Sequence, residues 1–327
     1  MKRLLLVGLG RFGRQHLRVL SELEVPLGLV DTDERALAEA RETVPSAACS
    51  RDLAALIPEA FAADVVVPAF AHRPVVEACL EAGLAVFCEK PLAPTTEDAV
   101  ALARVAEARK AVLQTGFVFR YHPATAVLLE LLEAGAIGAP LLVRARFTGF
   151  KRPRTDGGCA TNDAVHFADL ASLVFGGPAR TARGVARDLL GAGAESEALL
   201  SLEFGPRQLS HIEASYHVPG REREVLVIGE RGAVAIDFDA AEPVTLHRQV
   251  HEKGPAGIVA RDAEAERPPV SRAEPLRAEL QDFLENARRG ARPRADGWAG
   301  ARATAAIEAA LLAAREGRSV PVPQVGP

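Results

Sequence analysis

Four polar residues recur at helical spacing within an otherwise apolar stretch. Asn162, Asp163, His166 and Asp169 fall within a stripe about 120° wide when the expected helix, Asn162–Phe175, is projected at about 100° per residue. A helix that is apolar on its other sides is usually buried. Because buried polar groups need hydrogen-bond partners or a ligand, the stripe is a candidate for chemistry.

Within this stripe, His166 is the side chain best suited to exchange a proton near neutral pH. Asp163 or Asn162, three or four residues earlier, has the spacing to orient or polarise the imidazole. A structural interpretation stays open, in which Asn162 caps the helix, Asp163 interacts favourably with the helix dipole and His166 is a hydrogen-bonded core residue.

A glycine-rich loop follows the first expected strand, Arg3–Val7, and opens an expected helix, Arg11–Leu23. Its glycines permit a tight turn and close approach of the backbone to a pyrophosphate, which the helix N-terminus attracts. Asp31 ends the second expected strand, where a carboxylate accepts hydrogen bonds from the ribose of NAD and repels the 2′-phosphate of NADP. Its alternative role is to cap the next helix. NAD, in preference to NADP, is therefore expected to bind Gly8, Gly10, Arg11, Phe12, Gly13 and Asp31.

A lysine follows the expected strand Ala85–Cys88, within Glu89-Lys90-Pro91. Ligands of open α/β sheets bind beyond the carboxyl ends of the strands. An ammonium there could stabilise the alkoxide that forms as a substrate hydroxyl loses its proton, although a solvated turn lysine is the alternative. The chain has five lysines among 39 basic residues, so a lysine kept where arginine is the default suggests that a compact, titratable ammonium is needed.

The elements around these motifs divide the chain into two regions. Up to Tyr121, short apolar runs alternate with helical stretches, as in βαβ units with a parallel sheet covered on both faces. Later, several β-like runs follow one another with no helix between them, which indicates an antiparallel sheet. We expect an α/β Rossmann domain with a doubly wound parallel sheet (residues 1–122), then an α+β domain with a large, open, mostly antiparallel sheet (residues 123–327). The polar stretch Gly254–Pro269 is expected to be a surface loop.

Composition argues against several classes of function. The 327 residues carry 39 basic and 43 acidic side chains, a net charge of −4, so there is no basic surplus to bind nucleic acid or an anionic membrane. No apolar run reaches the ~18 residues of a membrane-spanning helix, and the N-terminus lacks the features of a signal peptide. The four cysteines form no CxxC pair and the eight histidines no HExxH motif, so no metal site is expected. A cytoplasmic protein is expected.

Together, these motifs resemble the Gfo/Idh/MocA family, named for glucose–fructose oxidoreductase, inositol dehydrogenase and a rhizopine-catabolism protein. The resemblance covers nearly the whole chain, and a Glu-Lys-Pro tripeptide at this spacing from a glycine loop is quite specific. It is carried by Gly8-x-Gly10-x-x-Gly13, Val67-Pro68-x-x-x-His72, Gly83 through Glu89-Lys90-Pro91, Gly116-x-x-x-Arg120-x-x-Pro123, and Gly157-Gly158 with His166-x-x-Asp169.

The resemblance implies NAD(P)-dependent hydride transfer that oxidises a secondary alcohol of a sugar, nucleotide sugar or cyclitol, or the reverse reduction. Lys90 carries over as the contact to the substrate hydroxyl and His166 as the general acid/base. The family usually has aspartate four residues before this histidine, where the chain has Asn162. Asp163 is therefore the third catalytic candidate.

The resemblance also implies further contacts and an assembly. Cofactor contacts are expected from Pro68, His72, Glu89 and Lys90 as well as from the glycine loop. Family members often assemble through the open sheet, so a homodimer or homotetramer is expected. Two other functions stay open: an NAD-binding regulatory or catalytically silent member, and a dihydrodiol or imine-type reductase on the same fold.

Substrate contacts are expected from basic and polar residues near the helix that carries the stripe. Arg120 and the cluster Lys151–Arg154 would suit a phosphate or carboxylate, so the sugar-like substrate could be anionic, although a solvated basic loop is the alternative. The residues expected to contact substrate are Arg120, Lys151, Asn162, Asp163 and His166.

Overall fold

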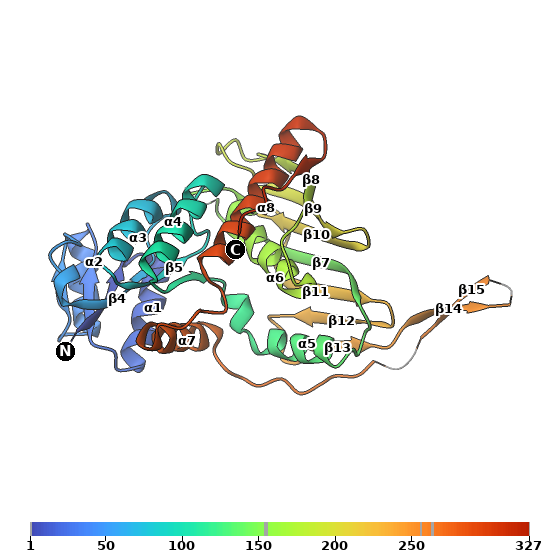
Figure 1. Cartoon of the computed structure of the whole chain (residues 1–327), viewed down its shortest axis with the longest axis horizontal. Coiled ribbons are helices and arrows are strands. Elements are labelled where there is room, and N and C mark those ends of the chain that lie inside the picture. The colour runs from blue at the N-terminus through green and yellow to red at the C-terminus, as the bar shows by residue number, and fades with distance from the viewer. Residues whose placement is uncertain (1, 154–155, 256, 263–264, 327) are drawn as a thin grey trace. The chain divides into compact units, whose positions relative to one another are not determined.

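The computed structural model describes residues 2–153, 156–255, 257–262 and 265–326 (Figure 1). The chain divides into two compact units. The first comprises Met1–Val118, Glu274–Thr304 and Val325–Pro327, and the second comprises Phe119–Ala273 and Ala305–Gln324. No helix in the described part of the chain is both long and apolar enough to cross a bilayer.

A parallel six-stranded sheet forms the centre of the first unit. Its strand order, β3-β2-β1-β4-β5-β6, is that of a doubly wound dinucleotide-binding fold, which confirms the predicted Rossmann fold. Its strands are β1 (Arg3–Val7), β2 (Leu27–Val30), β3 (Ala48–Ser50), β4 (Ala60–Val65), β5 (Ala85–Glu89) and β6 (Leu113–Gly116).

Helices cover both faces of this sheet, and the alternation along β1 shows why. Leu4 and Leu6 are buried in one core with α1, α2 and α7, whereas Leu5 and Val7 are buried in another with α3 and α4, because successive strand residues point to opposite faces. The helices are α1 (Arg11–Glu22), α2 (Glu34–Thr43), α3 (His72–Glu81), α4 (Thr96–Arg109) and α7 (Pro275–Arg289) (Figure 1).

The division of the chain differs from the sequence expectation at its C-terminal end. Residues 123–327 were expected to form one domain, yet Glu274–Thr304 belongs to the first unit. Leu280 and Phe283 of α7 are fully buried in the core that contains Leu4. The amphipathic pattern of α7 requires an apolar partner, but the pattern does not indicate which sheet provides it.

The second unit contains a mixed eight-stranded sheet in the order β13-β12-β11-β7-β10-β9-β8-β16. Neighbouring strands are antiparallel except for β7 and β10, which run parallel, so the prediction of a mostly antiparallel sheet is confirmed. The strands of this unit are β7 (Pro140–Gly149), β8 (Thr181–Arg187), β9 (Glu197–Gly205), β10 (Gln208–Ser215), β11 (Arg221–Gly229), β12 (Gly232–Asp237), β13 (Val244–His247), β14 (Val250–Gly254), β15 (Gly257–Arg261) and β16 (Val320–Pro321).

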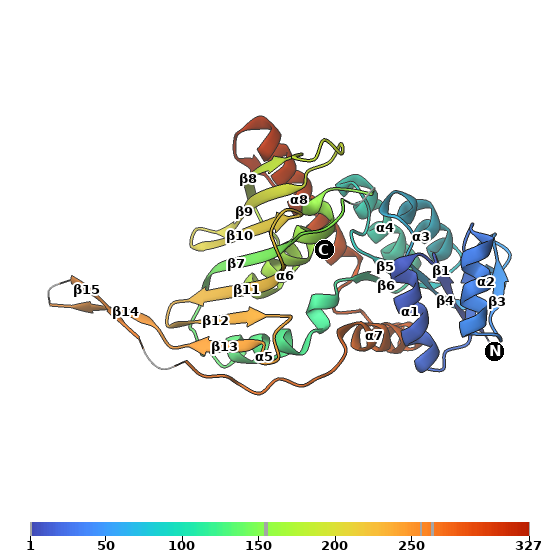
Figure 2. The same cartoon turned by 180° about the vertical axis from the view of Figure 1, so that it is seen from behind.

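One face of this sheet is covered by helices and the other is open. Helices α5 (Pro123–Glu133), α6 (Val165–Phe175) and the later part of α8 (Gly297–Glu316) lie on the covered face (Figure 2). On the opposite face, the cross-strand pair Val185 and Leu199 is 51% and 54% exposed. The sheet is therefore open, as predicted.

The stretch Gly254–Pro269 is not simply the loop expected from its polarity. Gly254 pairs with Gly257, and β14 and β15 form an antiparallel hairpin that extends away from the eight-stranded sheet (Figure 2). Gly257 has φ +125°, which glycine adopts readily, and the apolar Ile258 and Val259 favour an extended backbone. The strand propensity of Ile258 and Val259 was thus overlooked because the surrounding sequence is polar.

Candidate active site

The glycine loop lies between β1 and α1, where the sequence places it. Gly8 has φ +98°, and a Cβ there would lie 2.7 Å from the Val66 carbonyl oxygen, while a Cβ on Gly13 would lie 2.0 Å from the Gly8 oxygen. At Gly10, in contrast, a Cβ would have no described atom within 4 Å. Because the first turn of α1 carries no acidic side chain, its N-terminus is open to a pyrophosphate.

Asp31 connects this loop to the segment before α2 through its two carboxylate oxygens. Oδ2 accepts the Leu9 N–H at 2.6 Å and Oδ1 accepts the Asp33 N–H at 2.9 Å. The N-cap of α2 is Asp33, whose side chain accepts the Arg35 N–H, so the alternative role considered for Asp31 belongs to Asp33. A carboxylate oxygen accepts more than one hydrogen bond, so the position still fits a ribose hydroxyl.

The Glu-Lys-Pro turn lies at the carboxyl end of β5. Glu89 is buried, and its Oε2 accepts the Lys90 N–H at 3.1 Å. A Cβ on Gly116 of the neighbouring strand β6 would lie 2.6 Å from Glu89 Oε1. The glycine therefore makes room for the Glu89 carboxylate, which in turn holds the backbone of Lys90 at the edge where ligands of such sheets bind.

His72 connects this turn to the loop that follows β4. Its Nδ1 lies 2.9 Å from the Pro91 carbonyl oxygen and its Nε2 lies 2.9 Å from that of Val67. The side chain is 1% exposed, and Pro68 begins the short 3-10 turn next to it. His72 thus joins two segments of the predicted cofactor edge through contacts within the protein.

A buried charged cluster that sequence reasoning missed lies in the same unit. His16 Nδ1 is 2.8 Å from Asp64 Oδ2, and His16 Nε2 is 3.5 Å from Glu89 Oε1. Burial alone would lower the pKa of His16, but the Asp64 and Glu89 carboxylates raise this pKa to about 10. The imidazolium links α1, β4 and β5. One signal was present, since His16 shares the buried face of α1 with Val19 and Leu20.

In the second unit, the polar stripe is buried as predicted. Asn162, Asp163, His166 and Asp169 are 1%, 5%, 6% and 2% exposed. The segment Ala160–Ala164 forms a π-helical turn before α6 begins, so the regular projection over Asn162–Phe175 is wrong for its first residues. Such turns are frequent at functional sites.

The two residues that compete for the acidic position have different partners. Asp163 Oδ2 accepts a hydrogen bond from Lys151 Nζ at 2.6 Å, whereas Asn162 Nδ2 donates to the Gly157 carbonyl oxygen at 2.8 Å. Asn162 therefore anchors the preceding loop, and Asp163 forms an ion pair. Arg154, the last residue of the predicted basic cluster, lies outside the described residues.

Arg120 is also paired within the unit. Its Nε and Nη2 donate to the two carboxylate oxygens of Asp169 at 2.7 and 2.5 Å. This bidentate geometry is strong, and the Arg120 side chain is 11% exposed. The described geometry thus places Arg120 beside the stripe with its charge matched by a stripe carboxylate.

Aromatic rings surround His166. The ring of Phe119 meets it edge-on at 5.2 Å, and the ring of Phe147 is stacked at 5.8 Å with an interplanar angle of 6°. Lys151 Nζ lies 4.8 Å from the Phe147 centroid and 5.0 Å from that of Tyr216. Sequence reasoning missed this aromatic cluster because its residues come from separate elements.

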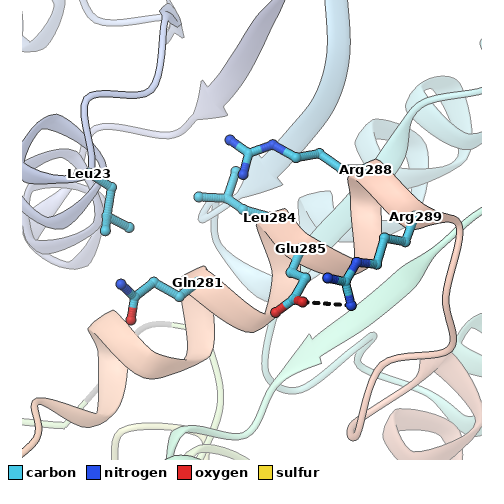
Figure 3. Close-up of a pocket in the computed structure, with 6 residues that line it drawn as sticks. All are labelled: Leu23, Gln281, Leu284, Glu285, Arg288 and Arg289. Carbon is cyan, nitrogen blue, oxygen red and sulfur yellow. Dashed lines mark ion pairs between the residues drawn. The ribbon is translucent and has the colours of Figure 1, made fainter.

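A shallow pocket of about 420 Å³ lies beside α7 in the first unit (Figure 3). Glu285 and Arg289 form an ion pair across 2.7 Å at its edge. None of the predicted site residues lines it, since its walls are Leu23, Gln281, Leu284, Glu285, Arg288 and Arg289. The candidate functional residues lie instead in two groups, the glycine loop and the Glu-Lys-Pro turn in the first unit and the polar helix in the second.

A Rossmann unit with a glycine loop, together with a second unit that buries a histidine among polar side chains, is the arrangement expected of a two-domain NAD-binding oxidoreductase. Two family models match the chain: the oxidoreductase family with an NAD-binding Rossmann fold at residues 2–117, and the C-terminal α/β domain of the same family at residues 129–322. The chain belongs to the Gfo/Idh/MocA family, as the resemblance predicted.

Similar proteins are named as dehydrogenases. Inositol 2-dehydrogenase 1 of Saccharopolyspora erythraea is 32% identical, over 97% of this chain and 95% of that protein. UDP-N-acetylglucosamine 3-dehydrogenase of Acidithiobacillus ferrooxidans is 31% identical, over 92% of this chain and 93% of that protein. A structure of levoglucosan dehydrogenase with NADH and L-sorbose has a TM-score of 0.85 at 18% identity, covering 99% of this chain and 100% of that chain.

Proposed function

We propose that the protein oxidises a secondary alcohol of a sugar, nucleotide sugar or cyclitol with NAD, or catalyses the reverse reduction. The observation that carries this proposal is the buried acid/base group, His166, in a member of an oxidoreductase family whose named relatives act on such alcohols. When bound, NAD supplies the hydride acceptor.

Each candidate residue is assigned its own role in the reaction. His166 takes the proton of the substrate hydroxyl, and Lys90 stabilises the alkoxide that develops. Asp163, held by Lys151 at 2.6 Å, contacts the substrate beside His166. Asn162 supports the site indirectly because its amide holds the loop at Gly157.

Binding of the cofactor is assigned to the loop and the strand ends of the first unit. Backbone N–H groups of Gly10 and of the first turn of α1, at Arg11 and Phe12, face the pyrophosphate. Asp31 accepts hydrogen bonds from the adenosine ribose. Glu89 and His72 hold the turn that carries Lys90 through the contacts described above.

The test measures NADH formation at 340 nm with a panel of polyols, aldoses, sugar acids and nucleotide sugars. His166→Ala and Lys90→Ala are each expected to lower kcat by roughly 10²–10⁴-fold, while NAD binding, measured by fluorescence quenching, persists. His251→Ala and Lys253→Ala are matched controls on the exposed hairpin and should retain full activity.

Two results would overturn parts of the proposal. If His166→Ala and Lys90→Ala turn over substrate as fast as the wild type, the assigned roles are wrong. If the wild-type protein binds NAD but forms no NADH with any member of the panel, and consumes none with the corresponding ketones, the protein is a silent or regulatory member of the family.

We also propose that the open face of the large sheet mediates a homodimer or homotetramer and that the protein works in the cytoplasm. The exposed pair Val185 and Leu199 supports the first proposal. The four cysteines, which are all free thiols, fit the reducing cytoplasm. Light scattering should show an oligomer that Leu199→Glu dissociates, and a monomeric wild type would contradict this assembly.

A further inference from the structure

A buried arginine outside the predicted site lies beside the aromatic ring that stacks on His166. Arg223 of β11 is registered opposite Phe147 of β7, and its guanidinium carbon is 3.5 Å from the Phe147 ring centroid. The residue is 7% exposed. Arg223 and His166 therefore contact the same phenyl ring, on the helix-covered face of the sheet.

The hydrogen bonds of Arg223 use one side of its guanidinium. Nη1 donates to the Thr148 carbonyl oxygen at 2.6 Å and to the Glu222 carbonyl oxygen at 2.5 Å. Within the described part of the chain, Nε and Nη2 make no hydrogen bond. These two atoms form the edge of the guanidinium that binds a carboxylate or phosphate in a bidentate way.

The charge of Arg223 also lacks a dedicated counter-ion among the described residues. The carboxylates that act on Arg223 electrostatically, Asp163 and Asp239, are held by other cations: Lys151 contacts Asp163 at 2.6 Å and Arg221 contacts Asp239 at 2.9 Å. A buried cation without a matched anion is costly, and a bound anion would remove that cost.

We propose that Arg223 binds an anionic group of the substrate, a carboxylate or a phosphate, on the same side of the sheet as His166. The inference rests on the proposed function and narrows its substrate class to sugar acids and nucleotide sugars. It also moves anion binding away from Arg120 and Lys151, which the sequence favoured, because both of those cations already pair with carboxylates.

The contacts of Arg223 make this site selective for planar, forked anions. The Phe147 ring and the two carbonyl oxygens hold the guanidinium in one orientation, so little conformational entropy is lost when an anion binds. Lysine at this position would keep the charge but not the forked donors.

The experiment compares matched acidic and neutral substrates. D-glucuronate is paired with D-glucose, and UDP-N-acetylglucosamine with N-acetylglucosamine, and KM and kcat are measured for the wild type, Arg223→Gln, Arg223→Lys and Arg207→Gln. Arg207 lies in the β9–β10 turn, where its exposed side chain pairs with Glu230, so it is a control for the loss of one positive charge from the same unit.

Arg223→Gln is expected to raise KM for the anionic member of the preferred pair by about 10–100-fold, the range for a charge-assisted hydrogen-bonded contact. Its kinetics with the neutral member should be unchanged. The KM of Arg223→Lys for the anionic member should fall between those of the wild type and Arg223→Gln, and the KM of Arg207→Gln should match that of the wild type. The preferred pair distinguishes the sources: the glucuronate pair indicates a carboxylate, and the nucleotide-sugar pair a phosphate.

The inference is overturned if the neutral members are the better substrates, or if Arg223→Gln impairs turnover of both members of a pair equally while its thermal unfolding matches that of the wild type. Thermal unfolding of Arg223→Gln and Arg223→Lys identifies a folding defect, which would appear as an equal loss with both members. Calorimetric titration with D-glucuronate or UDP, in the presence of NAD, separates the two proposals. If the wild type binds the anion and Arg223→Gln does not, the anion site is supported. If the wild type nevertheless turns over no substrate, the proposed function is overturned. If neither anion binding nor turnover is detected, the anion site and the proposed function are both overturned.

Discussion

Each unit of the molecule buries a histidine in a charged environment, and the two environments differ. In the first unit, both ring nitrogens of His16 face carboxylates, those of Asp64 and Glu89. In the second unit, the rings of Phe119 and Phe147 contact His166, and the nearby carboxylates are paired with Lys and Arg side chains.

This difference separates a structural cluster from a chemical one. An imidazole between two carboxylates stays protonated over the physiological range, so His16 cannot exchange a proton in a reaction near neutral pH. Its charge is used within the fold to join α1, β4 and β5. In the second unit, the Lys151 side chain is 32% exposed beside Asp163, and Arg223 presents unused donors, so that cluster is suited to a ligand.

The largest effect expected from this comparison is on stability, at His16. His16→Leu leaves two buried carboxylates without their cation, so the free energy of unfolding should fall by about 3–5 kcal/mol. Urea denaturation followed by circular dichroism measures it. The double variant His16→Leu with Asp64→Leu should recover part of the loss. A broken buried pair is expected to cost much more than about 1 kcal/mol. If the free energy of unfolding of His16→Leu alone lies within about 1 kcal/mol of the wild-type value, the charged cluster is contradicted.

The second effect is on the pH dependence of stability. Because the folded-state pKa of His16 is raised from 6.5 to about 10, its stabilising contribution is complete below pH 6.5 and disappears as the pH rises towards 10. The free energy of unfolding should fall by up to about 1.4 kcal/mol per pH unit in this window. In His16→Leu the free energy of unfolding should not show this slope. A wild-type free energy of unfolding that stays constant from about pH 7 to 9.5 would contradict the raised pKa of His16.

A smaller effect, on catalysis, is expected at the second cluster. Asp163→Asn removes the charge that pairs with Lys151, so kcat/KM should fall about 10–100-fold, equivalent to about 1.4–2.7 kcal/mol. Stopped assays under saturating NAD measure it. Asn162→Ala is the matched control, because its amide bonds to the loop at Gly157 and its loss should affect activity less. The reverse order of effects would make Asn162 the residue that acts beside His166.

The smallest effect concerns the choice of cofactor. Asp31→Asn removes the charge that repels a 2′-phosphate, so KM for NAD should rise about tenfold and activity with NADP should become measurable. Asp33→Asn alters the N-cap of α2 and should leave cofactor preference unchanged. An Asp31→Asn enzyme with the same NAD-to-NADP preference as the wild type would place the ribose contact elsewhere.

Much of the fold could be predicted because its signals are local. The strand β1 has the predicted bounds, and α1 and β5 each end within one residue of the predicted position, since apolar periodicity and punctuating glycine and proline residues are properties of short windows. The burial of the four stripe residues followed from the same argument. The π-helical turn before α6 did not. Its Ala160 N–H donates to Glu195 Oε1 at 3.1 Å, a contact with a distant segment that local periodicity does not indicate.

The pairs that define the clusters could not be predicted in this way. His16 meets Asp64 and Glu89 across three separate elements, and α7 returns to the first unit from more than 150 residues beyond its sheet. Arg223 alternates with Val225 and Val227 along β11, so a period of two could have indicated its burial, although not its partner on β7.

By itself, the sequence determined the Rossmann alternation, the glycine loop with Asp31, the Glu89-Lys90-Pro91 turn and the buried polar face around His166, because each depends on residues close together in the chain. Tertiary structure decided which carboxylate pairs with which cation. It brings Lys151 to Asp163 and Arg120 to Asp169, and leaves Arg223 with an unused donor edge. The physical reason is that strand register and helix packing set these distances between elements, and local periodicity carries no information about either.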